Sequence, residues 1–288
     1  MQLEIKKKDL LAIVTASCGV FLLSIGEWEE PLGSFTGPLG LSGAVFLILF
    51  TQVEIYRRLA RQQEEQTEHL QDARAQDYRQ LAAFLWLISA IKPRRPLPPM
   101  RGWAISPDLG NILISAILDG SPKVIVECGC GVSTLLMSYC MKQSGHGHIF
   151  SLEHDAEYAE LIRKELQLHQ LADMATVICA PLRQISLGGQ TWSWYDIEQL
   201  NGIGPIDLLF IDGPPGTIQE MARYPALPVL YKSLSENATV IFDDADRHDE
   251  RRIIERWLRE FKDLHCQSHD TEHGAVILNR EPRSCSSQ

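Results

Sequence analysis

From residue 101 onward, short apolar runs alternate with stretches whose apolar positions recur every three or four residues. The first pattern is typical of buried strands and the second of amphipathic helices. Strands that alternate with helices favour a parallel, doubly wound α/β sheet. The predicted strands are 123–127, 148–153, 175–179, 206–212, 238–243 and 274–279, with a further one at 265–269. The clearest predicted helices are 156–169 and 250–261.

The first 56 residues follow a different pattern, with two charge-free apolar stretches at 10–25 and 39–52. Both are shorter than a usual bilayer span of about 20 residues. Basic residues precede the first stretch and follow the second, whereas the loop between them carries only acidic charges. Under the positive-inside rule this predicts an N-terminal transmembrane helical hairpin with both ends in the cytoplasm. We therefore expect the rest of the chain at the cytoplasmic face of the inner membrane.

Two other interpretations of these stretches stay open. The first could be a cleaved signal peptide, although Ser24–Gly26 is a poor cleavage site. Both could also be core helices of a soluble domain, since each is short enough for one.

Residues 57–100 form a helical connector and a proline-rich linker. The polar stretch 54–75 predicts a solvated helix through which the chain could form a homo-oligomer, although its apolar residues are too sparse for a coiled coil. Residues 81–91 are apolar again, over a length that suits a buried or interfacial helix. We place the domain boundary at the prolines between 93 and 99, because proline disfavours helix at the residue before it. The main domain is then 101–280, followed by a tail at 281–288 that we expect to be disordered.

Composition narrows the function classes. A chain of 288 residues with 45% hydrophobic content can bury one full core and a smaller appendage. The net charge of -10 argues against a nucleic-acid partner, which would need a basic face. The seven cysteines show no paired or zinc-binding spacing, which favours a reduced, cytosolic domain.

The most informative motif lies at 124–136, where an apolar run ends in Glu127 and breaks into Gly129, Cys130 and Gly131 before a new apolar segment. Glycines allow a sharp turn and the close approach of a ligand. In α/β sheets, ligands bind at the carboxyl ends of strands beside helix amino termini. An ordinary tight turn remains the alternative.

A second carboxylate, Glu153, ends the next apolar run, where nucleotide-binding folds place the acid that bonds to the ribose. Thr134 stands where a dinucleotide fold has its third glycine, which argues against a pyrophosphate clamp. The pattern favours a nucleoside cofactor without phosphate, namely S-adenosylmethionine.

A series of motifs resembles class I S-adenosylmethionine-dependent methyltransferases, and most closely a bacterial branch similar to metal-dependent, catechol-type O-methyltransferases. The motifs lie at 127–134, 151–155, 180–182, 194–196, 207–216, 222–228 and 242–247. The resemblance implies a Rossmann-like, mostly parallel seven-stranded sheet with an antiparallel hairpin at its edge. It also implies cofactor contacts, with the glycine turn near the methionine part and Glu153 at the ribose. The cofactor-binding residues that we predict are Glu127, Gly129, Cys130, Gly131, Ser133, Glu153, His154, Ala180, Pro181 and Asp212.

Three carboxylates are predicted at one rim of the sheet, because Asp212 closes one strand while Asp243 and Asp244 close its neighbour. Such charges repel one another unless a cation joins them, and a hard divalent ion such as Mg²⁺ prefers oxygen ligands. The resemblance assigns the metal to the same three residues. In the alternative interpretation, one or two of them cap a helix or pair with Arg247.

The general base is harder to assign. Catechol-type enzymes carry a lysine three residues after the first metal aspartate, where this chain has Pro215. We select His248 and Asp212 as the catalytic residues, since the pKa of histidine suits neutral pH. Asp246 and Tyr195 are the other candidates for the base, and His248 could equally be a surface residue.

A few further residues stand near these motifs. Arg223 could bind an anionic group of the substrate or anchor its own loop, and Trp103 could belong to a lid or to the core. The aromatic residues Trp192, Trp194 and Tyr195 could stack on a planar substrate or pack against one another.

Two function classes follow. The first is a membrane-anchored, S-adenosylmethionine-dependent methyltransferase that modifies a hydroxyl of a small or lipid-linked acceptor with the help of a divalent cation. The second is a membrane-anchored interaction protein that keeps the fold without turnover. The complete set of carboxylates favours the enzyme.

Overall fold

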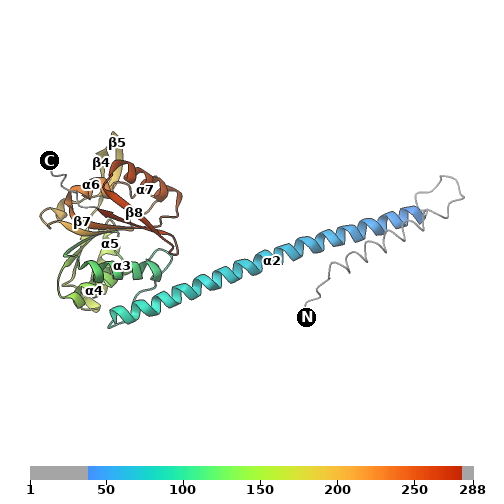
Figure 1. Cartoon of the computed structure of the whole chain (residues 1–288), viewed down its shortest axis with the longest axis horizontal. Coiled ribbons are helices and arrows are strands. Elements are labelled where there is room, and N and C mark those ends of the chain that lie inside the picture. Colours follow the sequence, from blue (N-terminus) through green and yellow to red (C-terminus); the bar gives the residue numbers. More distant parts are fainter. Residues whose placement is uncertain (1–37, 281–288) are drawn as a thin grey trace, which may run out of the picture. The chain divides into compact units, whose positions relative to one another are not determined.

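The computed structural model describes residues 38–280 and contains a seven-stranded sheet (Figure 1). The strand order is β3-β2-β1-β6-β7-β9-β8. The first five strands in this order are parallel, and β9 and β8 complete the sheet in antiparallel fashion. Its strands are β1 (Val124–Cys128), β2 (His148–Glu153), β3 (Ala175–Cys179), β6 (Ile206–Ile211), β7 (Leu234–Asp243), β8 (Leu264–His269) and β9 (Ala275–Arg280). The predicted Rossmann-like, mostly parallel sheet is therefore confirmed, with its edge hairpin.

Both faces of the sheet are buried, because its strands are apolar at successive positions. Ile125 and Phe210 point into one core cluster, while Val126 and Leu209 point into the other. This is why the central strands read as continuous apolar runs and not as alternating ones.

Helices cover the two faces in separate groups (Figure 1). One core cluster lies under α3 (Pro107–Gly120), α4 (Val132–Ser144) and α5 (Ala156–Leu168), and the other under α6 (Ala226–Leu230) and α7 (His248–Glu260). Short 3₁₀ turns, η1 (Glu198–Leu200) and η2 (Tyr231–Ser233), complete the connections. The two predicted helices correspond to α5 and α7.

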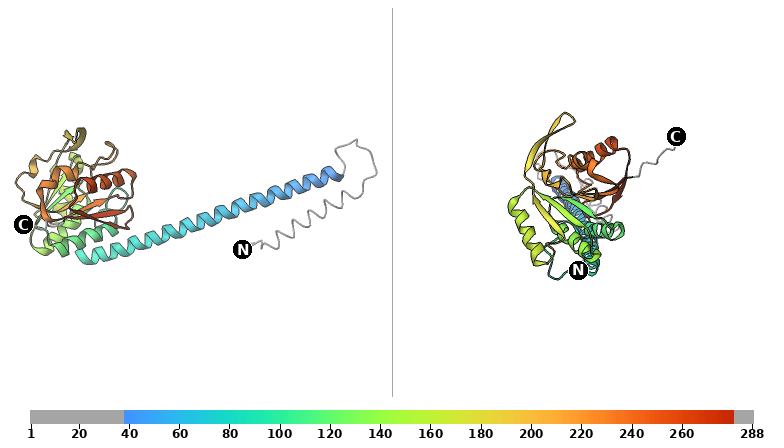
Figure 2. Two further views of the ribbon diagram at one scale, coloured as in Figure 1. Left: turned by 45° about the horizontal axis from the view of Figure 1, so that its top comes forward. Right: turned by 90° about the vertical axis from the view of Figure 1, so that its left-hand side faces the viewer.

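A β-hairpin stands between β3 and β6, where a regular alternation of strands and helices would place a helix (Figure 2). It consists of β4 (Leu182–Leu187) and β5 (Gln190–Tyr195), which pair antiparallel across Gly188 and Gly189. Trp192 and Trp194 are buried and join the core cluster of α6 and α7. Of the two interpretations of these tryptophans, the structure therefore shows the packed cluster.

The apolar stretch 39–52, the polar stretch 54–75 and the apolar stretch 81–91 all belong to one continuous helix, α2 (Pro38–Ile91). No helix within residues 38–280 is long and apolar enough to cross a membrane, so the structure gives no support to the second arm of the predicted hairpin, 39–52. The first arm, 10–25, and the tail at 281–288 lie outside the described residues.

By its contacts the chain divides into two units, with the boundary between Ala75 and Gln76, inside the predicted connector. The second unit contains the sheet and the last four turns of α2. Leu87 and Ile91 are buried there, and the side-chain amide of Gln80 donates to Asp108 at the start of α3. The predicted buried helix at 81–91 is thus part of the core of the main domain.

Candidate active site

The carboxyl ends of β1, β2, β6 and β7 meet at one edge of the sheet, and backbone hydrogen bonds continue the strand ladder past their last residues. The amide of Gly129 donates to the carbonyl of Leu152 at 2.9 Å, and that of Asp212 donates to the carbonyl of Cys128 at 3.0 Å. This alignment holds the glycine turn between Glu153 and Asp212.

A cavity of about 320 Å³ lies at this edge. Seven of the predicted site residues line it, namely Gly129, Cys130, Glu153, His154, Asp212, Asp243 and Asp244. The glycine turn and the carboxylate cluster therefore open into one space.

Two glycines that line the cavity, Gly129 and Gly213, lie close to one another. Gly129 has a φ of +91°, and a Cβ there would lie 3.2 Å from the amide nitrogen of Gly213. A Cβ on Gly213 would collide with the hydroxyl of Tyr195. The chain therefore needs glycine at both positions, in the first case for backbone conformation and in the second for space.

Glu127 does not line the cavity, although we predicted that it binds the cofactor. Its side chain is fully buried and accepts hydrogen bonds from the hydroxyls of Ser133 (2.5 Å), Thr134 (2.6 Å) and Ser151. It thereby ties the end of β1 to the start of α4 and to β2. Burial raises the pKa of Glu127 to about 7, against the opposing effect of the three hydroxyls.

Glu153 is held in place at the rim by its neighbours. Its carboxylate accepts a hydrogen bond from the backbone amide of Asp155 at 2.8 Å and lies 2.8 Å from the Nδ1 atom of His154. The thiol of Cys130 donates to its other oxygen at 3.8 Å. Because its side chain is 7% exposed and lines the cavity, Glu153 is well placed for the predicted ribose contact.

The remaining predicted cofactor residues are not among the residues that line the cavity. The amide of Gly131 donates to the Thr134 hydroxyl at 3.0 Å, and the Ser133 hydroxyl is used on Glu127. Ala180 is fully buried and its amide donates to the carbonyl of Glu153, while Pro181 is exposed. These residues shape the turns that carry the cavity-lining residues.

Tyr195 provides an unused donor beside the glycine turn. It ends β5, lines the cavity and is 2% exposed, yet its hydroxyl has no hydrogen-bond partner among the described residues. A buried hydroxyl without a partner is costly, which suits a site that a polar ligand completes. The unused hydroxyl, the glycine turn and Glu153 together fit a nucleoside cofactor.

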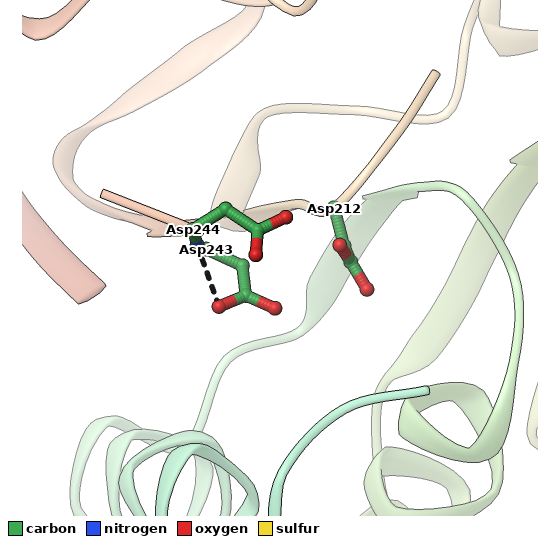
Figure 3. A group of neighbouring side chains, drawn as sticks. All are labelled: Asp212, Asp243 and Asp244. Carbon is green, nitrogen blue, oxygen red and sulfur yellow. Dashed lines mark hydrogen bonds between the residues drawn. The ribbon is translucent and has the colours of Figure 1, made fainter. Parts of the chain in front are cut away.

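The three predicted carboxylates do come together (Figure 3). One oxygen from each of Asp212, Asp243 and Asp244 lies within 4.8 Å of the others. Asp244 has a φ of +61°, a left-handed conformation that aspartate tolerates better than most residues. This turn at the end of β7 points its side chain towards Asp212 rather than along the strand (Figure 3).

Two arginines already neutralise this cluster. The guanidinium of Arg223, which is 4% exposed, lies 3.1 Å from Asp212 and 2.9 Å from Asp244. Arg247 lies 2.8 Å from the same oxygen of Asp244. We predicted a metal because three carboxylates without a cation repel one another, and the structure removes that premise. The arrangement of the three carboxylates therefore fits the guanidinium of an arginine better than it fits a divalent ion.

The protonation of the cluster is shifted by burial. Burial raises the pKa of Asp212 to about 7, while the nearby charge of Arg223 acts in the opposite direction. Burial also raises the pKa of Asp243 well above its usual range, and the charges of Asp212 and Asp244 add to this effect. A carboxyl group that titrates near neutral pH is suited to accept a proton during catalysis.

His248, which we selected as a catalytic base, is not brought to the cavity. It is the first residue of α7, its side chain is 84% exposed, and its Nδ1 lies 3.4 Å from Asp249. The sequence motif placed it only four residues after Asp244, but the helix that starts there directs it to the surface.

Other residues line the cavity that we did not assign to the site. Tyr158 comes from α5 and His273 from the loop between β8 and β9, and the sequence offers no motif at either position. Trp103 lines the rim with 87% of its surface exposed, which fits neither burial in the core nor a closed lid.

Comparison with known proteins agrees with this geometry. The sequence model of a family described as "Methyltransferase domain" matches residues 126–245, from β1 to the residue after Asp244. No curated protein matches the chain.

Solved structures with the same fold are numerous. A candidate O-methyltransferase from Klebsiella pneumoniae has a TM-score of 0.50 and 19% identity, over 72% of this chain and 96% of its own. The O-methyltransferase TomG from Streptomyces achromogenes, involved in tomaymycin synthesis and solved in complex with SAM, has a TM-score of 0.49 and 16% identity, over 69% of this chain and 89% of its own. At this identity, the first likeness shows the fold. The family match over residues 126–245 agrees with the resemblance to methyltransferases that the motifs indicated.

Proposed function

We propose that the chain is a class I S-adenosylmethionine-dependent methyltransferase and that it transfers the methyl group to a hydroxyl oxygen of a small acceptor. One observation carries the choice of acceptor atom. The cavity that holds the glycine turn and Glu153 also contains Asp212, a carboxylate whose pKa of about 7 suits it to remove a proton from a hydroxyl group.

Each part of the cavity has a role in this transfer. Glu153 and Tyr195 would bind polar groups of the cofactor, and Gly129 allows its close approach to the backbone. When bound, S-adenosylmethionine supplies an electrophilic methyl group on a sulfonium. Asp212 would take the proton of the acceptor hydroxyl, whose oxygen would receive the methyl group from the sulfonium in its place. Holding the acceptor beside the methyl group supplies the proximity that a two-substrate transfer needs.

No step of this reaction uses the divalent cation that we predicted from the sequence. The positive charge near the carboxylates comes from Arg223 and Arg247.

The test is a titration followed by an assay. We expect isothermal titration of the full-length chain to show one S-adenosylmethionine site, and we expect radiolabelled methyl transfer to members of a panel of phenols, catechols and aliphatic alcohols. A folded chain that binds no cofactor at millimolar concentration would exclude the enzyme. It would leave the interaction protein as the better interpretation. Cofactor binding with transfer only to amines or thiols would refute the hydroxyl acceptor.

We further propose that the chain acts at the cytoplasmic face of the inner membrane. The first turns of α2 expose five large apolar side chains, those of Val45, Phe46, Leu47, Ile48 and Phe50, each at least 41% exposed. Apolar surface of this extent is typical of membrane or protein contact sites. A lipid-linked acceptor and self-association through the N-terminal helices would follow from this location. Recovery of the full-length chain in the soluble fraction without detergent would contradict it.

A further inference from the structure

The carboxylate cluster is bridged by a guanidinium in the place where a metal ion would bridge it. Asp212 follows β6 and Asp244 follows β7, and Arg223 reaches both from the loop between these strands. One of its terminal nitrogens contacts Asp212 and the other contacts Asp244. The cation thus joins two neighbouring strands, as a shared divalent ion would.

Each carboxylate of the cluster already has one oxygen engaged. Asp212 accepts from Arg223, and Asp244 accepts from Arg223 and Arg247. One oxygen of Asp243 accepts from the backbone amide of Asp244 at 2.7 Å (Figure 3). A metal would have to use the other three oxygens, immediately beside the guanidinium.

That position is unfavourable for a divalent ion. Like charges at this separation repel one another, and a divalent ion beside a guanidinium meets twice the repulsion that a singly charged ion would meet. Arg223 cannot withdraw into water, because it is 4% exposed and also donates to the backbone carbonyl of Asp243 at 3.3 Å. Arginine is suited to this position since its planar fork contacts two carboxylates at once.

We propose that Arg223 is the resident cation of this site and that the domain works without a divalent metal. Arg223 takes over the electrostatic role that catechol-type enzymes give to the ion, because it neutralises the carboxylates and holds Asp212 in position. Arg223 is therefore a positioning residue. The inference concerns the same site as the proposed methyl transfer, but its test needs no turnover, so the two can fail separately.

The decisive experiment is a Mn²⁺ titration followed by electron paramagnetic resonance, with full-length protein and no acceptor. We expect the wild-type chain to show no stoichiometric site up to about 1 mM Mn²⁺, and S-adenosylmethionine binding to be unaffected by EDTA. Arg223→Met removes the cation that separates the carboxylates. We therefore expect this variant to gain one Mn²⁺ site per chain and to bind Mn²⁺ at least tenfold more tightly than the wild-type chain. The gain should disappear when Asp243→Asn is added.

A matched control is Arg252→Met. Arg252 also lies between two carboxylates, 3.6 Å from Glu220 and 3.3 Å from Asp249, but it is outside the cavity, so its loss should create no Mn²⁺ site. A wild-type chain that binds one Mn²⁺ through Asp243 would overturn the proposal, as would a folded Arg223→Met that gains none. If Arg223→Met does not fold, the wild-type titration decides the question alone.

Discussion

At the scale of the residue, Asp212 has the position and the pKa that a proton acceptor needs. We expect Asp212→Asn to lower the rate of methyl transfer by about 10²- to 10⁴-fold, which is the usual contribution of a general base. The wild-type rate should rise with pH and level off above about 7, since the base must be ionised. The variant should lose this dependence.

This prediction has two controls. One is the affinity of the variant for the cofactor, and the other is the substitution of a second aspartate. Asp212→Asn should bind S-adenosylmethionine within a few-fold of wild type, because Glu153 and the glycine turn are unchanged. Asp246→Asn removes a carboxylate that is 69% exposed and should leave the rate as it is. An unaltered pH profile in Asp212→Asn would show that another group takes the proton.

The second prediction concerns Glu127 and the dependence of the protein's stability on pH. Its pKa rises on folding from 4.5 to about 7, so the folded state binds more protons than the unfolded state between these values. Its contribution to stability is therefore present below pH 4.5 and is lost as the pH rises through 7. A shift of this size corresponds to about 3 kcal/mol.

Urea unfolding at pH 5 and pH 8 measures this effect. The loss of stability between the two values should be smaller in Glu127→Gln than in wild type, while Asp212 and Asp243 contribute equally to both. Glu157→Gln, at an exposed position in the first turn of α5, should keep the wild-type difference. Equal pH dependence in wild type and Glu127→Gln would be the contrary result.

At the scale of the element, the close contact between the turns of Gly129 and Gly213 shapes the lining of the cavity. Gly213→Ala places a methyl group against the hydroxyl of Tyr195 and 3.0 Å from the Cα of Gly129. We expect this overpacking to cost about 1–3 kcal/mol in unfolding free energy and to weaken cofactor binding. Gly216→Ala lies in the same loop, where a Cβ meets nothing within 4 Å, and thermal unfolding should show almost no change. Similar melting temperatures for the two variants would refute this packing argument.

Strands and their carboxyl-end residues could be predicted, because buried parallel strands are continuous apolar runs with sharp ends. The positions of Glu153, Asp212, Asp243 and Asp244 at one edge follow from that register alone. The hairpin of β4 and β5 was missed although Gly188-Gly189 and the alternation around Trp192 and Trp194 are hairpin signals. The sequence prediction treats its aromatic residues only as a cluster or a stacking surface.

The occupant of the carboxylate cluster could not be predicted for a different reason. Arg223 lies eleven residues after Asp212 in a loop without periodicity, and nothing in the local sequence fixes where its side chain points. Tyr158 and His273 reach the cavity in the same way, through packing between distant segments. Sequence patterns locate the rim of a parallel sheet, whereas the side chains that cross it depend on tertiary structure.

At the scale of the whole molecule, α2 raises the question of where the catalytic domain begins. The proline cluster at 93–99 suggested a start near residue 101, yet Leu87 and Ile91 are buried in the core beneath α3 and α4. The contacts of Gln80 and of Asn111, which donates to the carbonyl of Ala83, tie the same turns to α3. The last turns of α2 therefore belong to the domain energetically.

Two truncated chains test whether the domain begins within α2 or after the proline cluster. A chain of residues 76–288 keeps Leu87 and Ile91, so it should melt cooperatively and bind S-adenosylmethionine as the full-length chain does. A chain of residues 93–288 exposes the surface that these two side chains cover. The loss of one buried aliphatic side chain typically costs about 2–5 kcal/mol. We therefore expect the shorter chain to lose most of the free energy of unfolding of a domain of this size. Circular dichroism melting and cofactor titration of both chains test this. Equal stability of the two would mean that α2 only rests against the domain, and that the proline cluster is the true boundary.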